Sequence, residues 1–106
     1  MSKRRYRVEV TGSAERDFYN EVTWLIENRS KPVVKRFKIA FDRVLKRLAI
    51  EPQAWQVVEV SGRSLRRAII EGRWIVLYKI DHAQDRVVVL GLRGAAEDWM
   101  NMPITD

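Results

Sequence analysis

Arginine is the residue type in this 106-residue chain that is best placed to do chemistry. Five arginines lie in or beside predicted strands, where a fixed backbone aims a guanidinium group at a phosphate or carboxylate with little loss of side-chain entropy. They are Arg63, Arg66, Arg67, Arg73 and Arg93. Arg67 and Arg93 are the stronger candidates for function. Arg63 and Arg73 also fit a simpler role, as charges that keep a strand edge soluble.

The residues predict little other chemistry. Without cysteine, the chain has no disulfide, no thiolate nucleophile and no sulfur-ligated zinc. The single histidine, His82, falls in a predicted polar loop without a positioned neighbour for general-base catalysis. The five glycines stand singly, so no phosphate-binding loop is predicted. We therefore expect no metal site and no cofactor, and we assign no catalytic residue on this basis.

The strands that carry most of these arginines form a predicted hairpin. Residues 65–70 and 74–80 are rich in β-branched and aromatic side chains, and only Glu71 and Gly72 fill the turn between Ile70 and Arg73. Such a turn predicts three cross-strand pairs on one face: Ile69 with Trp74, Arg67 with Val76, and Leu65 with Tyr78. This mixed aromatic and basic face is the predicted working surface. The opposite face, with Ala68, Ile75 and Leu77, is expected to receive a helix.

Two helices are predicted between an N-terminal strand and this hairpin. Residues 6–11 alternate apolar and polar side chains, as a half-buried strand does. Ser13 is the expected N-cap of a helix that ends near residues 28–30, and Pro32 suits the first turn of the next. The second helix has a continuous apolar stripe, and its many cations occupy the rest of its surface: Lys31, Lys35, Lys38, Arg43, Lys46 and Arg47.

The order strand, helix, helix and then three or four strands indicates an α+β fold. We expect one domain over residues 1–106, with an antiparallel two-helix hairpin on one face of a largely antiparallel sheet of four or five strands. The strands at 74–80 and 87–92 are apolar on both alternating sets, yet two helices cover one face only. The other face must be covered by the C-terminal segment or by another chain. We expect the second, a polypeptide that docks where the arginine and tryptophan side chains reach the surface together.

The composition is that of a basic folded domain. Lys and Arg outnumber Asp and Glu by 20 to 14, giving a net charge of +6, which favours an acidic partner. No apolar run has the length of a signal peptide or of a membrane span, so we expect a cytoplasmic protein that does not contact a membrane.

Several short motifs, in order, resemble the RelE/ParE superfamily of toxins from type II toxin-antitoxin systems. The resemblance covers nearly the whole chain, and its most specific parts lie after residue 65. They are Arg66-Arg67 at the start of a strand, the Gly-Arg-Trp-x-x-x-Tyr run of residues 72–78, the Val-Val-Val-Leu strand of 87–90, and Leu-Arg-Gly-Ala-Ala-Glu-Asp-Trp at 92–99.

This resemblance implies a bacterial growth inhibitor that is neutralised by a cognate antitoxin. RelE-like members cut messenger RNA on the ribosome, whereas ParE-like members poison DNA gyrase and have no evident hydrolytic set. The chain is closer to the second group: residues 56–60 lack the lysines usual in RelE-like members, and the ending at 92–99 looks ParE-like. It departs from that group at Arg93, where histidine is frequent.

The resemblance and the residues together predict a non-enzymatic gyrase inhibitor, with a ribosome-dependent mRNA endoribonuclease as the alternative. A nuclease would use Arg66, Arg67 and Arg93 to hold phosphate and stabilise the developing charge. The predicted surface for target or antitoxin consists of Arg66, Arg67, Arg73, Trp74, Tyr78, Arg93 and Trp99.

Overall fold

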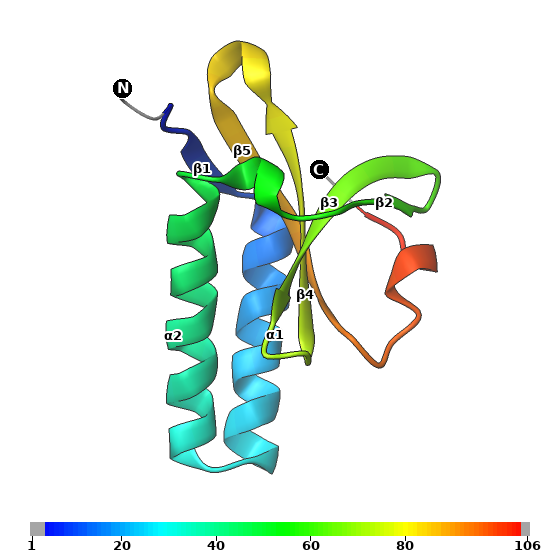
Figure 1. Cartoon of the computed structure of the whole chain (residues 1–106). Coiled ribbons are helices and arrows are strands. Elements are labelled where there is room, and N and C mark those ends of the chain that lie inside the picture. Colours follow the sequence, from blue (N-terminus) through cyan, green and yellow to red (C-terminus); the bar gives the residue numbers. More distant parts are fainter. Residues whose placement is uncertain (1–3, 105–106) are drawn as a thin grey trace.

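The computed structural model describes residues 4–104 and shows two helices packed on a five-stranded sheet (Figure 1). The helices and strands are β1 (Arg7–Val10), α1 (Gly12–Asn28), α2 (Lys31–Leu48), β2 (Val57–Val60), β3 (Arg63–Ile70), β4 (Trp74–Asp81) and β5 (Arg86–Gly94). Short 3-10 helices are η1 (Pro52–Ala54), η2 (His82–Gln84) and η3 (Trp99–Asn101). The predicted α+β class and element order are confirmed.

The strand order in the sheet is β1-β5-β4-β3-β2. β1 runs parallel to β5, and the other neighbouring strands are antiparallel. Because β1 pairs only with residues 86–89, the second half of β5 has a free edge, and α1 lies against it. There Asp17 accepts a hydrogen bond of 3.1 Å from the amide of Leu92, which satisfies part of that edge.

The two helices cover one face of the sheet. α2 buries Phe37, Phe41 and Leu48 in a core cluster that also holds Leu25 of α1 and Val76 of β4. Burial of large apolar side chains of this kind contributes about 1.5–3 kcal/mol each, so this stripe fixes which side of α2 faces outward.

The start of α1 differs from the prediction. Thr11, and not Ser13, is the N-cap: its hydroxyl accepts a hydrogen bond of 3.2 Å from the amide of Ala14, and the helix begins at Gly12. Both residue types cap well, so the local sequence did not discriminate between them. The choice follows from β1, since the Thr11 amide still bonds to the carbonyl of Val89 in the sheet.

The hairpin of β3 and β4 has the predicted turn but not the predicted register. Glu71 and Gly72 both have positive φ, 50° and 68°, and the Arg73 amide bonds to the Ile70 carbonyl at 2.9 Å. However, Trp74 pairs with Ile70, which leaves Arg73 as an extra residue in the turn. A shift of one residue moves a side chain to the other face of a strand.

The register shift reverses the predicted faces of β4 but not those of β3. The helices pack on the face that carries Trp74, Val76 and Tyr78, together with Ala68 and Ile70. The prediction that Ile75 and Leu77 receive a helix is therefore wrong.

The second face of the sheet is covered by the chain's own C-terminal segment. A separate apolar cluster there contains Leu65, Ile75, Leu77 and Leu90, all buried, and Trp99 and Ile104 pack against it. Ser61 fixes the segment, because its amide bonds to the Met100 carbonyl at 2.8 Å and its hydroxyl donates to the Met102 carbonyl at 2.7 Å. The expectation that a second polypeptide must cover this face is therefore wrong, because the C-terminal segment already covers it.

Candidate functional site

Arg66 and Arg67, the central pair of the predicted site, lie on opposite faces of β3. Arg66 is on the same face of β3 as Ala68, which is the face that the helices cover. Its Nη1 donates to the carbonyls of Trp55, at 2.6 Å, and Gln53, at 3.3 Å. Arg67 is on the other face, where its Nη2 donates to Oε1 of Gln56 at 2.6 Å. Both guanidinium groups therefore hold the segment that connects α2 to β2.

Arg93 is a buried residue that joins three parts of the chain. Its side chain is 8% exposed, and Nη1 forms an ion pair of 2.6 Å with Asp17 of α1. Nη2 donates to the Pro103 carbonyl at 3.0 Å, which ties down the C-terminal segment. A Cβ atom on Gly91 would lie 2.8 Å from Nη1, so glycine at this position leaves room for the guanidinium group.

Trp74 and Tyr78 are core residues. The indole Nε1 of Trp74 donates to Glu21 of α1 at 3.0 Å, and the hydroxyl of Tyr78 donates to the Pro52 carbonyl at 2.6 Å. Burial raises the pKa of the Tyr78 hydroxyl well above its ordinary value of 10.0, although the positive charge of Arg66 partly opposes the shift. Both aromatic rings thus serve the packing of sheet against helices.

The remaining two predicted residues are more accessible. Arg73 is exposed in the hairpin turn, and Trp99 is half-buried against the second apolar cluster. The predicted surface, in which Arg67 shares a face with Trp74 and Tyr78, is wrong: Arg67 lies on the opposite face and both aromatic residues are buried. A binding role for Arg66, Arg67, Arg73 or Trp99 stays a prediction.

The structure also keeps apart the three arginines of the alternative nuclease. Arg66 and Arg67 are on different faces, and Arg93 is held by Asp17 at the free edge of β5. A phosphate held by several guanidinium groups requires that they converge, which these do not. Across residues 4–104, no three His, Asp or Glu side chains meet in a group that would hold a metal ion.

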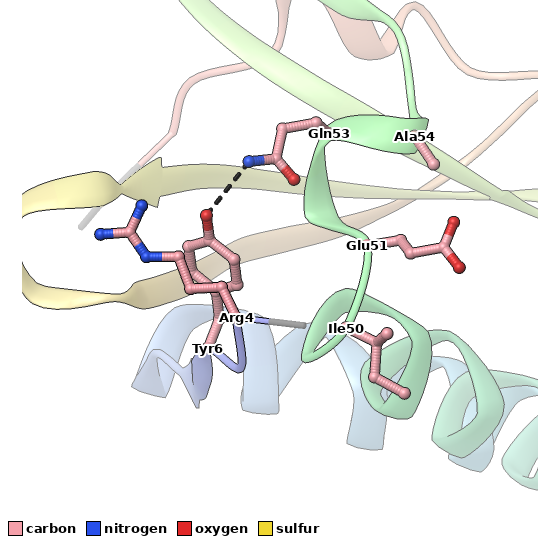
Figure 2. Close-up of a pocket in the computed structure, with 6 residues that line it drawn as sticks. All are labelled: Arg4, Tyr6, Ile50, Glu51, Gln53 and Ala54. Atoms are coloured by element: carbon pink, nitrogen blue, oxygen red, sulfur yellow. Dashed lines mark hydrogen bonds between the residues drawn. The ribbon is translucent and has the colours of Figure 1, made fainter. Parts of the chain in front are cut away.

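A depression of about 590 Å³ lies between the N-terminal segment, the end of α2 and η1 (Figure 2). In it, Gln53 donates to the hydroxyl of Tyr6 at 3.1 Å, and the guanidinium carbon of Arg4 is 5.9 Å from the Tyr6 ring centre. Arg4 also forms an ion pair with Asp85 and reaches the His82 carbonyl. The polar groups that line this depression therefore have partners within the chain, and none belongs to the predicted site.

The match to known proteins agrees with this fold. A model of the ParE toxin of the parDE type II toxin-antitoxin system matches residues 8–99. The chain belongs to the ParE toxin family. It is thus a toxin of the RelE/ParE superfamily from a type II system, as the sequence motifs predicted. No curated protein is significantly similar to this ParE-family chain.

Several solved structures share the fold of this chain. The RelBE2 toxin-antitoxin complex from Mycobacterium tuberculosis is 22% identical over 88% of this chain and 94% of that chain, with a TM-score of 0.61. The archaeal RelE-RelB complex from Pyrococcus horikoshii OT3 is 20% identical over 88% and 98%, with a TM-score of 0.55. The conserved protein HP0894 from Helicobacter pylori is 18% identical over 87% and 97%, with a TM-score of 0.54.

Neither helix of the described residues 4–104 combines the length and apolar character that a membrane span requires.

The sequence predicted that the cations of α2 lie on its surface, but no function was predicted for them. The signal that would have singled them out is the net charge of each predicted element, taken separately.

Proposed function

We propose that this ParE-family chain arrests bacterial growth by binding and poisoning DNA gyrase, and that a cognate antitoxin neutralises it. The observation that carries the proposal is the match of the ParE toxin model over residues 8–99. ParE-like members of the superfamily act on gyrase, according to the resemblance described above.

The positions of the arginines support a binding protein over a nuclease. General acid-base or electrostatic catalysis on an RNA phosphate needs several groups around one reacting centre. Arg66, Arg67 and Arg93 instead donate to carbonyl oxygens, an amide oxygen and a carboxylate of their own chain. A nuclease built on these three residues would first have to release these interactions.

Two observations support binding of an antitoxin: the similar toxin-antitoxin complexes and the positive net charge of the chain. Two of the similar structures are complexes of a RelE-type toxin with its antitoxin, RelBE2 and RelE-RelB. The net charge of +6 attracts an acidic antitoxin segment at long range, wherever on the chain that segment docks. Arg66, Arg67, Arg73 and Trp99 are the predicted site residues that remain at least partly accessible to such a partner or to gyrase.

Two parallel assays test the proposal. In the first, the purified chain is added to gyrase, ATP and relaxed plasmid, and both supercoiling and protein-linked cleaved DNA are measured. In the second, it is added to ribosomes that hold a message, and cleavage of the message in the A site is mapped. We expect inhibition and trapped cleavage in the first assay and intact message in the second. Intact supercoiling with a cut message would replace the proposal with the endoribonuclease alternative.

A further inference from the structure

The excess positive charge of the chain is confined to one helix. α2 holds seven of the 20 Lys and Arg residues but only one of the 14 Asp and Glu residues, so the other 88 residues carry 13 charges of each sign. The net charge of +6 is therefore that of α2. Like charges on one short helix repel one another and gain nothing for folding, so their concentration there points to a partner.

Most cations of α2 also lack a partner. Within residues 4–104, Lys31, Lys35, Lys38, Arg43 and Arg47 form no ion pair with a carboxylate. The two ion pairs that α2 makes, Arg36 with Glu71 and Lys46 with Asp42, are both solvent-exposed. Exposed pairs of this kind contribute about 0–1 kcal/mol, so they hold the side chains weakly.

We define the basic face of α2 as Lys35, Arg36, Arg43, Lys46 and Arg47, all exposed. Arg36, Arg43 and Arg47 form one row, because residues seven and eleven positions apart lie on the same side of a helix; the row is about 16 Å long at 1.5 Å per residue. Phe37 and Phe41, buried on the opposite side, prevent the helix from turning this face away. α2 lies at one edge of the molecule in Figure 1, and the five side chains of the basic face are all exposed to solvent.

We propose that the basic face of α2 binds the phosphate backbone of duplex DNA without reading its sequence. The row of arginines spans about five base-pair rises of 3.4 Å, so its three guanidinium groups can contact phosphates distributed over that length of the duplex. An acidic protein fits less well, because specific protein interfaces have an extended apolar centre, whereas among the described residues of α2 Ile39 is the single large apolar side chain that is exposed. The inference goes beyond gyrase binding and does not depend on it.

The test is a fluorescence anisotropy titration of the full chain with a labelled 20-base-pair duplex of arbitrary sequence, repeated over a series of salt concentrations without gyrase. Arg43→Gln/Arg47→Gln is compared with Arg5→Gln/Arg16→Gln, which removes two exposed and unpaired arginines outside α2. We expect the first variant to bind at least ~10-fold more weakly near 0.1 M salt and to lower the slope of log K against log salt by about 1.8. The control should change both values by less than half as much.

Arg43→Lys/Arg47→Lys, which keeps both charges, should retain most of the binding, and circular dichroism checks that every variant is folded. Three results would overturn the inference. One is an absence of binding by the parent chain at low salt. Another is equal weakening by the two glutamine variants, which would show attraction by net charge alone. The third is competition by poly-glutamate as effective as that by unlabelled duplex, which would identify the face as a site for an acidic polypeptide.

Discussion

The arginines of the sheet and the cations of α2 differ in what surrounds them. Arg66, Arg67 and Arg93 each donate to oxygen atoms of their own chain, and Arg93 is buried. Arg43 and Arg47 of α2 are exposed and form no ion pair within residues 4–104. The same residue type thus stabilises the fold in one region and is available for a partner in the other.

This comparison explains why the predicted site was misplaced. A strand gives a rigid support for a functional arginine, which is why the strand arginines were the first candidates. The same rigid support also lets neighbouring carbonyls and carboxylates satisfy the guanidinium group. Accessibility, and not rigidity alone, separates the two roles.

The largest expected effect comes from Arg93→Ala. Its removal leaves Asp17 without its ion pair and frees the Pro103 carbonyl that holds the C-terminal segment. Removing one partner of a buried pair destabilises by about 3–5 kcal/mol; because Asp17 is 27% exposed, we expect the lower end, about 3 kcal/mol. Urea unfolding measures the change. A loss below about 1 kcal/mol would contradict a structural role for Arg93.

Tyr78 gives an intermediate effect with a distinctive pH dependence. Its pKa is raised in the folded state, so its hydroxyl stays protonated while an unfolded tyrosine ionises near pH 10. The stability that depends on this hydroxyl is therefore present below pH 10 and is lost as the pH rises above that value. We expect Tyr78→Phe to lower the free energy of unfolding by about 1–2 kcal/mol at pH 7, because the Pro52 carbonyl loses its donor.

The pH dependence itself is measured by urea unfolding at pH 8, 9, 10 and 10.5 for both proteins. Tyr78→Phe should lose less stability than the parent chain between the first and last of these values. Parallel curves for the two proteins would mean that Tyr78 does not titrate differently in the folded and unfolded states.

The smallest expected effect on stability is that of Arg43→Gln/Arg47→Gln. Both side chains are exposed and without carboxylate partners, so we expect the free energy of unfolding to change by less than about 0.5 kcal/mol. A loss of unfolding free energy as large as that of Arg93→Ala would mean that these exposed arginines stabilise the fold as much as the buried one does. A small gain would fit relief of the repulsion along α2.

Local chemistry predicted the elements well. The break between the helices at Ser30, Pro32 in the first turn of α2, the apolar stripe of α2 and the turn at Glu71-Gly72 each follow from backbone preferences or from periodicity within a few residues. Strands apolar on both faces do have two covers, but the second cover is the C-terminal segment and not the second polypeptide that was expected. The N-cap and the register were less secure, because neighbouring residues satisfy the same local rule.

The sequence by itself determined the fold class, the superfamily and the concentration of charge on α2, because each depends on residue types and spacing along the chain. Only the tertiary structure decided which arginines are accessible. Arg73 enters the turn as one extra residue, and this single step places Trp74 and Tyr78 under the helices and Arg67 on the opposite face. Side chains alternate between the two faces of a strand, so a register shift of one residue moves every side chain of that strand to the other face. The local sequence of the hairpin is compatible with either register, so it could not predict which face each side chain takes.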